Sequence, residues 1–408
     1  MLIIQQIEKT ENRIVVRFST DDEWAGFIKE ASVENIYDEN IEQVPDSIAA
    51  IPALCNLLPI AWTFDLKIHC PEMDDEFMKA VPEIRAGYQK MYPDMKFGGE
   101  LTADRTVRNT YDASRCAVLF SGGVDATVTA FRHMDEKPDI VTVLGADIKL
   151  TDKEGIKNVN EFNSRFSDEH HLQYERIYSA FRTFIHEWRL TQTEALTSRN
   201  LDWYHDFQHG IGLIGLVAPL SYVRGYKTVY IASSYHESQW GQYKCASDPV
   251  IDNRLKYGAT CTFHDGYELT RQEKVRYICD YADQKNVKPF LRVCWESGGG
   301  KNCCHCEKCR RTYMAVLAEK HDPADFGLAF TKTQVRRMIK WYKRHLPYSF
   351  DRIVLPLYAD IQKAFVRNYK SEEIPKELKW LWDVRIGEKP FSKMNRLIDK
   401  VEKKLGME

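Results

Sequence analysis

A short glycine-containing loop holds residues that could do chemistry. Four apolar residues at 117–120 predict a strand buried on both faces, and a helix-compatible run continues to about Met134. Between them stand Ser121, Gly122, Gly123, Val124 and Asp125. Glycines let backbone N–H groups approach an anion, and a helix start adds about half a positive charge. We therefore expect an anion site in which Ser121 offers a hydroxyl and Asp125 orients a metal or substrate.

The loop differs from the commoner phosphate loops. The chain has no GxxxxGK[ST] motif, and the loop lacks the GxGxxG of dinucleotide folds. It resembles the SGGxDS pyrophosphate loop of the N-type ATP pyrophosphatase (PP-loop) superfamily, except that Ala126 replaces the last serine and removes one hydroxyl contact. The resemblance implies ATP with Mg²⁺ on its phosphates, attack on the α-phosphorus, and release of pyrophosphate. The alternative is a glycine turn without a ligand.

Four cysteines form a second group with the spacing C-x8-C-x2-C-x2-C: Cys294, Cys303, Cys306 and Cys309. Four thiolates can hold one tetrahedral zinc ion at about 2.3 Å, and the glycines at 298–300 let the first cysteine return to the ion. Cys304 and His305 are expected to be spare, because only Cys303 keeps the x2 spacing. The pattern predicts a structural Zn²⁺ knuckle over residues 294–309, with an iron–sulfur cluster as the alternative.

The loop followed by this cysteine run resembles the 7-cyano-7-deazaguanine synthase (QueC-like) family over about residues 114–318. Those enzymes activate a 7-carboxy-deazaguanine carboxylate with ATP and convert it to a nitrile with ammonia. Here Gln208-His209-Gly210 stands where the family has an Arg-Asn pair. Similar proteins occur in anti-phage defence systems. The resemblance therefore implies a small-molecule carboxylate or a protein as acceptor, and a partner protein from the same operon.

Further candidate residues follow predicted strands or open a predicted helix. Asp147 follows a strand at Asp139–Leu144, and Ser233 follows one at Lys227–Ala232, where ligands gather in open α/β sheets. Asp147 could equally be a solvated loop acid. Asp147 is a candidate contact for the nucleotide or substrate, and Ser233 is a candidate contact for the nucleotide.

A capping box, Thr270-x-x-Glu273, predicts a helix through about Tyr281 and places Arg271 and Lys274 near its first turn. Cations there oppose the helix dipole, and a bound phosphate would remove that conflict. A solvated pair is the alternative. With Ser121 and Asp125, these two cations are the candidate catalytic residues.

The elements that position these residues alternate between strands and helices. Residues 111–320 therefore predict an α/β fold with a doubly wound parallel sheet, as in adenine nucleotide alpha hydrolase-like proteins. We expect a helix over Tyr174–Trp188 and a buried helix over Gly210–Val223.

Two flanking regions complete the predicted organisation. Residues 1–110 are expected to form a separate α+β domain, with a hairpin at 2–18, a strand at 61–70 and a helix at 74–91. Residues 321–408 are expected to be helical, with Trp380 and Trp382 anchoring a packed tail.

Composition limits the classes of function. The 408 residues carry a net charge of −2, and no apolar run approaches the roughly 20 residues of a membrane span. The first residues do not read as a signal peptide, and the eleven cysteines favour reduced thiols or metal. We expect a cytoplasmic protein without a membrane partner. Residues 331–345 carry six Lys and Arg and no acid, which suits RNA phosphate, an acidic partner, or a solvated helix face.

These observations predict an ATP-dependent ligase or synthase that adenylates a carboxylate, giving AMP and pyrophosphate. Two alternatives stay open. Related ATP loops serve tRNA thiolation, in which Cys304 would carry the sulfur. Ala126 and the flanking regions would also fit a non-catalytic nucleotide-binding subunit of a larger complex.

Overall fold

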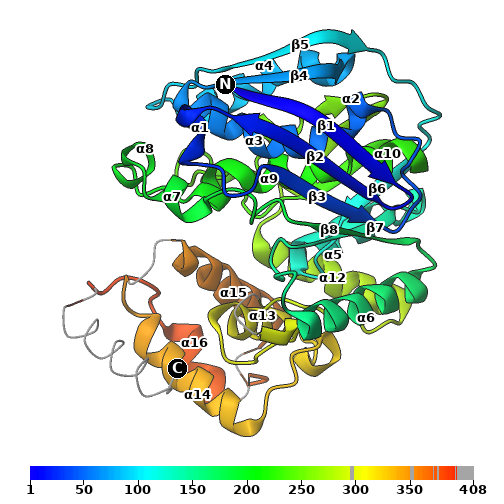
Figure 1. The fold of residues 1–408 in the computed structure, drawn as a ribbon. Coiled ribbons are helices and arrows are strands. Elements are labelled where there is room, and N and C mark those ends of the chain that lie inside the picture. The colour runs from blue at the N-terminus through cyan, green and yellow to red at the C-terminus, as the bar shows by residue number, and fades with distance from the viewer. Residues whose placement is uncertain (295–297, 350–352, 371, 375, 391, 393–408) are drawn as a thin grey trace. The chain divides into compact units, whose positions relative to one another are not determined.

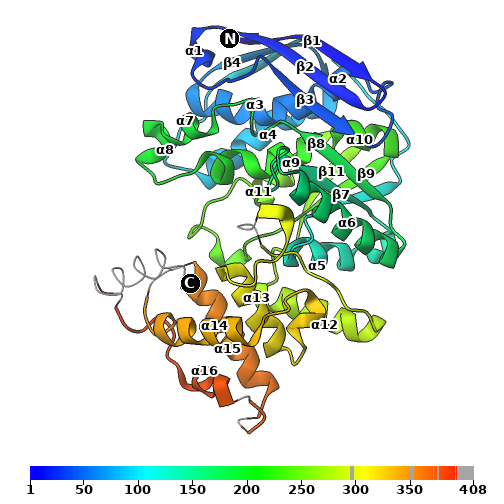
Figure 2. The same ribbon diagram turned by 60° about the horizontal axis from the view of Figure 1, so that its bottom comes forward.

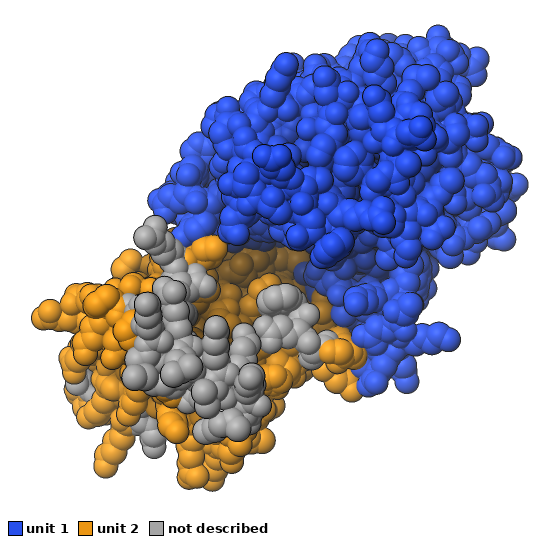
Figure 3. Space-filling model, turned by 60° about the vertical axis from the view of Figure 1, so that its left-hand side comes forward, with its two compact units in different colours: residues 1–121, 132–268 blue, residues 122–131, 269–408 orange. Residues whose placement is uncertain are grey.

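The computed structural model describes residues 1–294, 298–349, 353–370, 372–374, 376–390 and 392. The chain divides into two compact units (Figure 3). Unit 1 contains residues 1–121 and 132–268, and unit 2 contains residues 122–131 and 269–408.

Unit 1 is built on one sheet of eleven strands (Figure 1). Five neighbouring strands run parallel in the spatial order β11-β9-β6-β7-β8: β6 (Arg115–Leu119), β7 (Asp139–Leu144), β8 (Tyr174–Ser179), β9 (Tyr226–Ala232) and β11 (Thr260–Asp265). The antiparallel strand β10 (Lys256–Tyr257) lies at the edge. The chain moves outward from β6 to β8 and returns on the other side with β9, so the strand order reverses beside β6. A mixed α/β fold with a mostly parallel sheet is therefore confirmed, whereas its PP-loop subtype stays a prediction.

The N-terminal strands extend the same sheet beyond β8, in the order β3-β2-β1-β4-β5. They are β1 (Leu2–Thr10), β2 (Arg13–Thr20), β3 (Ser32–Tyr37), β4 (Lys67–Asp74) and β5 (Glu100–Val107). The predicted hairpin is confirmed as the antiparallel pair β1–β2. Strand β3 joins the two halves of the sheet, because it pairs with both β2 and β8.

Residues 1–110 do not stand apart as the predicted separate domain; they belong to unit 1. Three tyrosines of this segment donate buried hydrogen bonds to carbonyl groups far along the chain. Tyr37 bonds Leu216 at 3.1 Å. Tyr88 and Tyr92 bond Phe207 and Asp206 at 2.5 and 2.6 Å. One hydrophobic core includes both regions, from Leu2 to Tyr257.

Two sequence predictions in unit 1 were wrong. The strand expected at 61–70 begins only at Lys67, because residues Ile51–Phe64 form helix α3, with Pro59 inside it. Nearly every residue of α3 is buried, so its apolar run has no helical periodicity to read. The helix expected over Tyr174–Trp188 is instead strand β8 followed by turns and the short helix α7 (Glu187–Thr191). Alternate residues of β8 are buried, which is the strand period.

The remaining helices of unit 1 follow the predictions more closely. The predicted helix at 74–91 is α4 (Asp75–Met91), and Asp74 caps it by accepting from the Phe77 N–H. The buried run after residue 208 forms α9 (His209–Leu216) and α10 (Ala218–Arg224), and Gly225 ends it with φ 72°. The other helices are α1 (Asp22–Ala25), α2 (Asp46–Ala49), α6 (Lys153–His170), α8 (Glu194–Thr197) and α11 (Pro249–Asp252).

Unit 2 is helical. It contains α5 (Val124–Arg132) except its last residue, and then α12 (Arg271–Lys285), α13 (Glu307–Ala318), α14 (Lys332–His345), α15 (Val354–Asn368) and α16 (Lys379–Asp383) (Figure 2). Residues 393–408 of the predicted helical region lie outside the described residues. Within the described ranges, no helix combines the length and apolarity that a membrane crossing requires.

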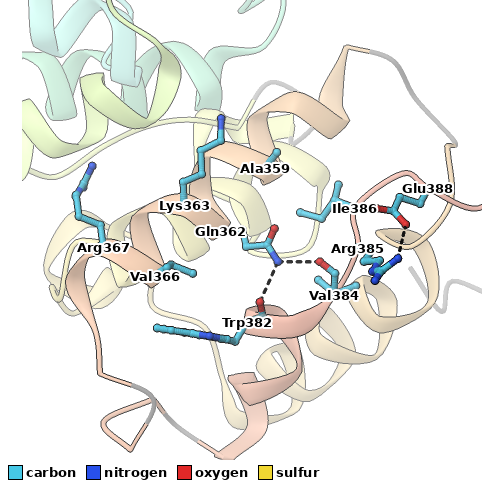
Figure 4. A pocket seen from close by; sticks show the side chains of 10 residues that line it. All are labelled: Ala359, Gln362, Lys363, Val366, Arg367, Trp382, Val384, Arg385, Ile386 and Glu388. Carbon is cyan, nitrogen blue, oxygen red and sulfur yellow. Dashed lines mark hydrogen bonds and ion pairs between the residues drawn. The ribbon is translucent and has the colours of Figure 1, made fainter.

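A surface hollow of about 640 Å³ lies between α15 and the segment after α16 in unit 2 (Figure 4). Its three cations are already paired: Lys363 with Asp360, Arg367 with Glu319, and Arg385 with Glu388. The amide of Gln362 donates to backbone carbonyls of Leu381 and Val384. None of the predicted site residues lines this hollow.

Candidate phosphate site and metal centre

The predicted loop joins strand β6 to helix α5. Strand β6 ends at Leu119, and Gly122 follows with φ 78°, a backbone conformation that favours glycine. Helix α5 begins at Val124, so Gly122 and Gly123 immediately precede its first N–H groups, which cannot be paired by the helix itself. The carbonyl of Gly122 accepts the Arg292 N–H at 2.8 Å, which holds the turn against a second segment of unit 2.

Two cations of helix α12 hold Asp125 in the first turn of α5. Arg271 Nη1 lies 2.8 Å from one carboxylate oxygen, and Lys274 Nζ lies 3.2 Å from the other. The Lys274 side chain is only 3% exposed. Burial alone would raise the pKa of Asp125, but the charges of Arg271 and Lys274 outweigh it and lower that pKa. Asp125 is therefore ionised at neutral pH.

The predicted capping box explains how α12 presents these two side chains. Thr270 Oγ1 accepts from the Glu273 N–H at 3.3 Å, and Glu273 Oε2 accepts from the Thr270 N–H at 2.8 Å. Both halves of the box are present, which fixes where the helix starts. Arg271 and Lys274 are three residues apart and therefore share one face of the helix.

Helix α13 brings further positive charge to the same region. The charge of Lys308 also lowers the pKa of Asp125. Burial lowers the pKa of Arg271, and repulsion from the buried guanidinium of Arg311 lowers it further. Arg311 is itself paired with Glu307 at 2.7 Å. Cations of two helices thus gather near the first turn of α5. The sequence did not reveal the roles of Lys308 and Arg311, which stand one residue before and two residues after Cys309.

The four predicted cysteines come together in unit 2. The sulfur atoms of Cys294, Cys303, Cys306 and Cys309 all lie within 4.8 Å of one another. The Cys294–Cys306 and Cys303–Cys309 sulfur pairs are 3.8 and 3.9 Å apart. Tetrahedral bonds of about 2.3 Å would place sulfurs about 3.8 Å apart, so the cluster fits a zinc ion. The hydrogen bond between the Cys306 and Cys309 thiols lowers the pKa of Cys306 and raises the pKa of Cys309.

The two spare residues stay out of the cluster, as predicted from the spacing. Cys304 has φ 56°, and its thiol faces the Asn302 carbonyl at 3.8 Å. His305 is exposed, and its Nδ1 lies 3.0 Å from the Cys303 carbonyl oxygen.

Asn302 joins the chain segments around the cysteines, a role that the sequence did not reveal. Its side-chain oxygen accepts from the N–H groups of Val293 and Cys294 at 2.9 and 3.2 Å. Its amide donates to the carbonyls of Leu291 and Gly327 at 2.7 and 3.0 Å. Cys306 then stands at the N-cap of α13, so the cluster also fixes where that helix begins.

The predicted nucleotide contacts Asp147 and Ser233 lie in unit 1, at the carboxyl ends of β7 and β9. Asp147 is exposed. Ser233 is buried, and its hydroxyl already donates to the Tyr235 carbonyl at 2.6 Å. Ser121 is the last residue of unit 1 before the loop and is exposed. Contact of these three residues with a nucleotide stays a prediction.

A group that the sequence did not reveal lies near Asp147 in unit 1. The Arg182 guanidinium stacks on the Tyr204 ring at 3.7 Å and donates to the Ala146 carbonyl. Within the described residues, the buried atoms Tyr204 Oη and His209 Nδ1 have no hydrogen-bond partner. Burial lowers the pKa of His209, which keeps the imidazole neutral at physiological pH.

In comparisons with known proteins, no family model, curated protein or solved structure matches the chain.

Proposed function

We propose that this protein is an ATP-dependent enzyme of the PP-loop type that adenylates a carboxylate and releases pyrophosphate. The observation that carries the proposal is the convergence of Lys274 and Arg271 on Asp125, beside two glycines at the start of a nine-residue helix. A buried lysine, the N–H groups at a helix start and a carboxylate are the components of a magnesium-phosphate site.

The strand order supports the same location. Ligands in open α/β sheets bind beyond the carboxyl ends of the strands, where the strand order reverses. Here the order reverses beside β6, and the loop directly follows β6.

Each group of residues would have its own role in this reaction. The glycine N–H groups and the two α12 cations would stabilise negative charge on the β- and γ-phosphates, so that pyrophosphate leaves as a unit. ATP and Mg²⁺ would supply the activated phosphorus and a bridge between phosphates, with Asp125 as the carboxylate ligand. A carboxylate acceptor needs no general base, because its oxygen is already a nucleophile. The four cysteines would hold a structural zinc ion, since four thiolates leave no position for water.

The test follows the label of α-³²P-ATP in the presence of Mg²⁺ and 7-carboxy-7-deazaguanine, alone and with candidate partner proteins. We expect pyrophosphate and an equal amount of labelled acyl-AMP, from which attack of water or ammonia on the acyl carbon releases labelled AMP. Label in ADP would refute the mechanism. Label in AMP only when a partner protein is present would keep the mechanism and assign a protein acceptor.

A further inference from the structure

The charges of the two units differ strongly. Unit 1 has 27 Lys and Arg against 40 Asp and Glu, whereas unit 2 has 30 against 19. Unit 2 is therefore basic, although the net charge of the whole chain is only −2. The strongest concentration of that charge is helix α14, with six Lys and Arg and no acid.

The six cations of α14 lie on one side of the helix. At 3.6 residues per turn they fall within an arc of about 140° and span about 18 Å along the axis. They are Lys332, Arg336, Arg337, Lys340, Lys343 and Arg344, and we call this surface the basic stripe. All but Arg344 are exposed.

The opposite side of α14 is fixed in place. Met338 and Tyr342 are buried, and the Tyr342 ring packs edge-on against Tyr358 of α15 at 5.1 Å. The Arg310 guanidinium lies over the Trp341 ring at 5.6 Å. A capping box at Thr331 begins the helix. The basic stripe is therefore held by packing on a defined face of unit 2.

The charges of the basic stripe would destabilise α14 as an isolated helix. Lys332, Arg336, Lys340 and Arg344 succeed one another at intervals of four residues, and like charges at this spacing repel. Lys332 also stands in the first turn, where a cation opposes the helix dipole. Within the described residues no ion pair involves Lys332, Arg336, Arg337 or Lys340. By contrast, Lys363 and Arg367 of α15 each pair with an acid.

We propose that the basic stripe of α14 binds the phosphodiester backbone of a nucleic acid. This proposal is independent of the nucleotide and metal sites. A row of cations without acids complements a linear polyanion, whose recognition by Lys and Arg is largely electrostatic. The stripe offers no exposed apolar anchor, and protein interfaces usually need such anchors and are depleted in lysine. These features favour nucleic acid over an acidic protein.

The test is fluorescence anisotropy of the full chain with labelled 25-nucleotide RNA and DNA, single- and double-stranded, at several salt concentrations. The stripe variant replaces Lys332, Arg336, Arg337 and Lys340 by Gln. The matched control replaces four exposed cations by Gln: Arg276 and Lys285 on α12, Lys363 on α15, and Lys370 just after α15. Both variants lose the same charge, and thermal melting verifies that both fold.

We expect wild type and control to bind, and the stripe variant to bind at least about tenfold more weakly. Its slope of log affinity against log salt should fall by about 3 for single strands, at roughly 0.7 per lost phosphate contact. The nucleic acid that binds most tightly identifies RNA or DNA as the source of the phosphates. Equal losses in stripe and control variants, or no binding by the wild type, would overturn the proposal. Displacement of the nucleic acid by polyglutamate of equal charge would also overturn it, in favour of an acidic polypeptide.

Discussion

At the scale of single residues, Asp125 supplies a negative charge that faces both Arg271 and Lys274. Its side chain is 19% exposed, and that of Lys274 is 3% exposed. Removing one partner of such a pair is expensive, because the remaining charge stays buried. We expect Asp125→Asn to lower the free energy of unfolding by about 2–3 kcal/mol at pH 7. Pyrophosphate without magnesium should raise the melting temperature of this variant more than that of the wild type, since it replaces the missing anion.

The exposed Asp135, replaced by Asn, is the matched control and should melt like the wild type. Equal stabilisation of Asp125→Asn and wild type by pyrophosphate would argue against a phosphate at this position.

The lowered pKa of Asp125 also makes the free energy of unfolding depend on pH. The folded-state pKa lies below the unfolded value of about 3.9, so the stabilisation is fully present above that value. It is lost as the pH falls through the lower, folded-state pKa. Denaturant titrations should show a constant difference in unfolding free energy between wild type and Asp125→Asn from pH 5 to 8. The difference should shrink below about pH 4, and a difference that grows there would contradict the ion-pair assignment.

The adjacent residues Cys303 and Cys304 allow a test of which cysteines bind the metal. Cys303 belongs to the cluster, whereas the thiol of Cys304 faces a carbonyl. We expect elemental analysis to find about one zinc per chain in wild type and Cys304→Ser, and a loss of zinc with a lower melting temperature in Cys303→Ser. The reverse result would show that the register is wrong.

At the scale of elements, the cysteine segment and α13 depend on Asn302. Its four hydrogen bonds reach two chain segments, residues 291–294 and Gly327, and Asn302→Ala leaves several backbone groups without partners. We expect a loss of about 2–4 kcal/mol of stability and faster release of zinc to a chelator. His305→Ala changes an exposed neighbour and should release zinc at the wild-type rate. Equal rates for both variants would assign Asn302 no role in retaining the metal.

The sequence predicted elements best where a local signal was complete. A few neighbouring residues determine the geometry of the capping box before α12, the hairpin β1–β2 and the cysteine cluster. The structure contains all three. Helix α3 was mistaken for a strand because a helix buried on all sides loses its periodicity. The contacts of Arg271 and Lys274 with Asp125 could not be predicted from the sequence, because α5 and α12 are about 140 residues apart.

At the scale of the whole molecule, the two ends of the sheet depend on each other. Strand β3 pairs with β8, and three buried tyrosine hydrogen bonds join residues 1–110 to residues 206–216. A chain that begins at residue 111 would expose the edge of β8 and the apolar face that α3 and its neighbours cover. The N-terminal segment is thus expected to be part of one folding unit with β6–β11.

We therefore expect residues 111–408 expressed alone to aggregate, and the same residues co-expressed with residues 1–110 to give a soluble, non-covalent complex. Complementation is the informative control, because both samples contain the same chain end at residue 111. Size-exclusion chromatography and thermal melting would measure the outcome. A monodisperse 111–408 fragment with a cooperative transition of its own would show that the N-terminal segment is an independent domain. Tyr88→Phe removes only the bond to Phe207, so it should cost about 1 kcal/mol and leave the full chain folded.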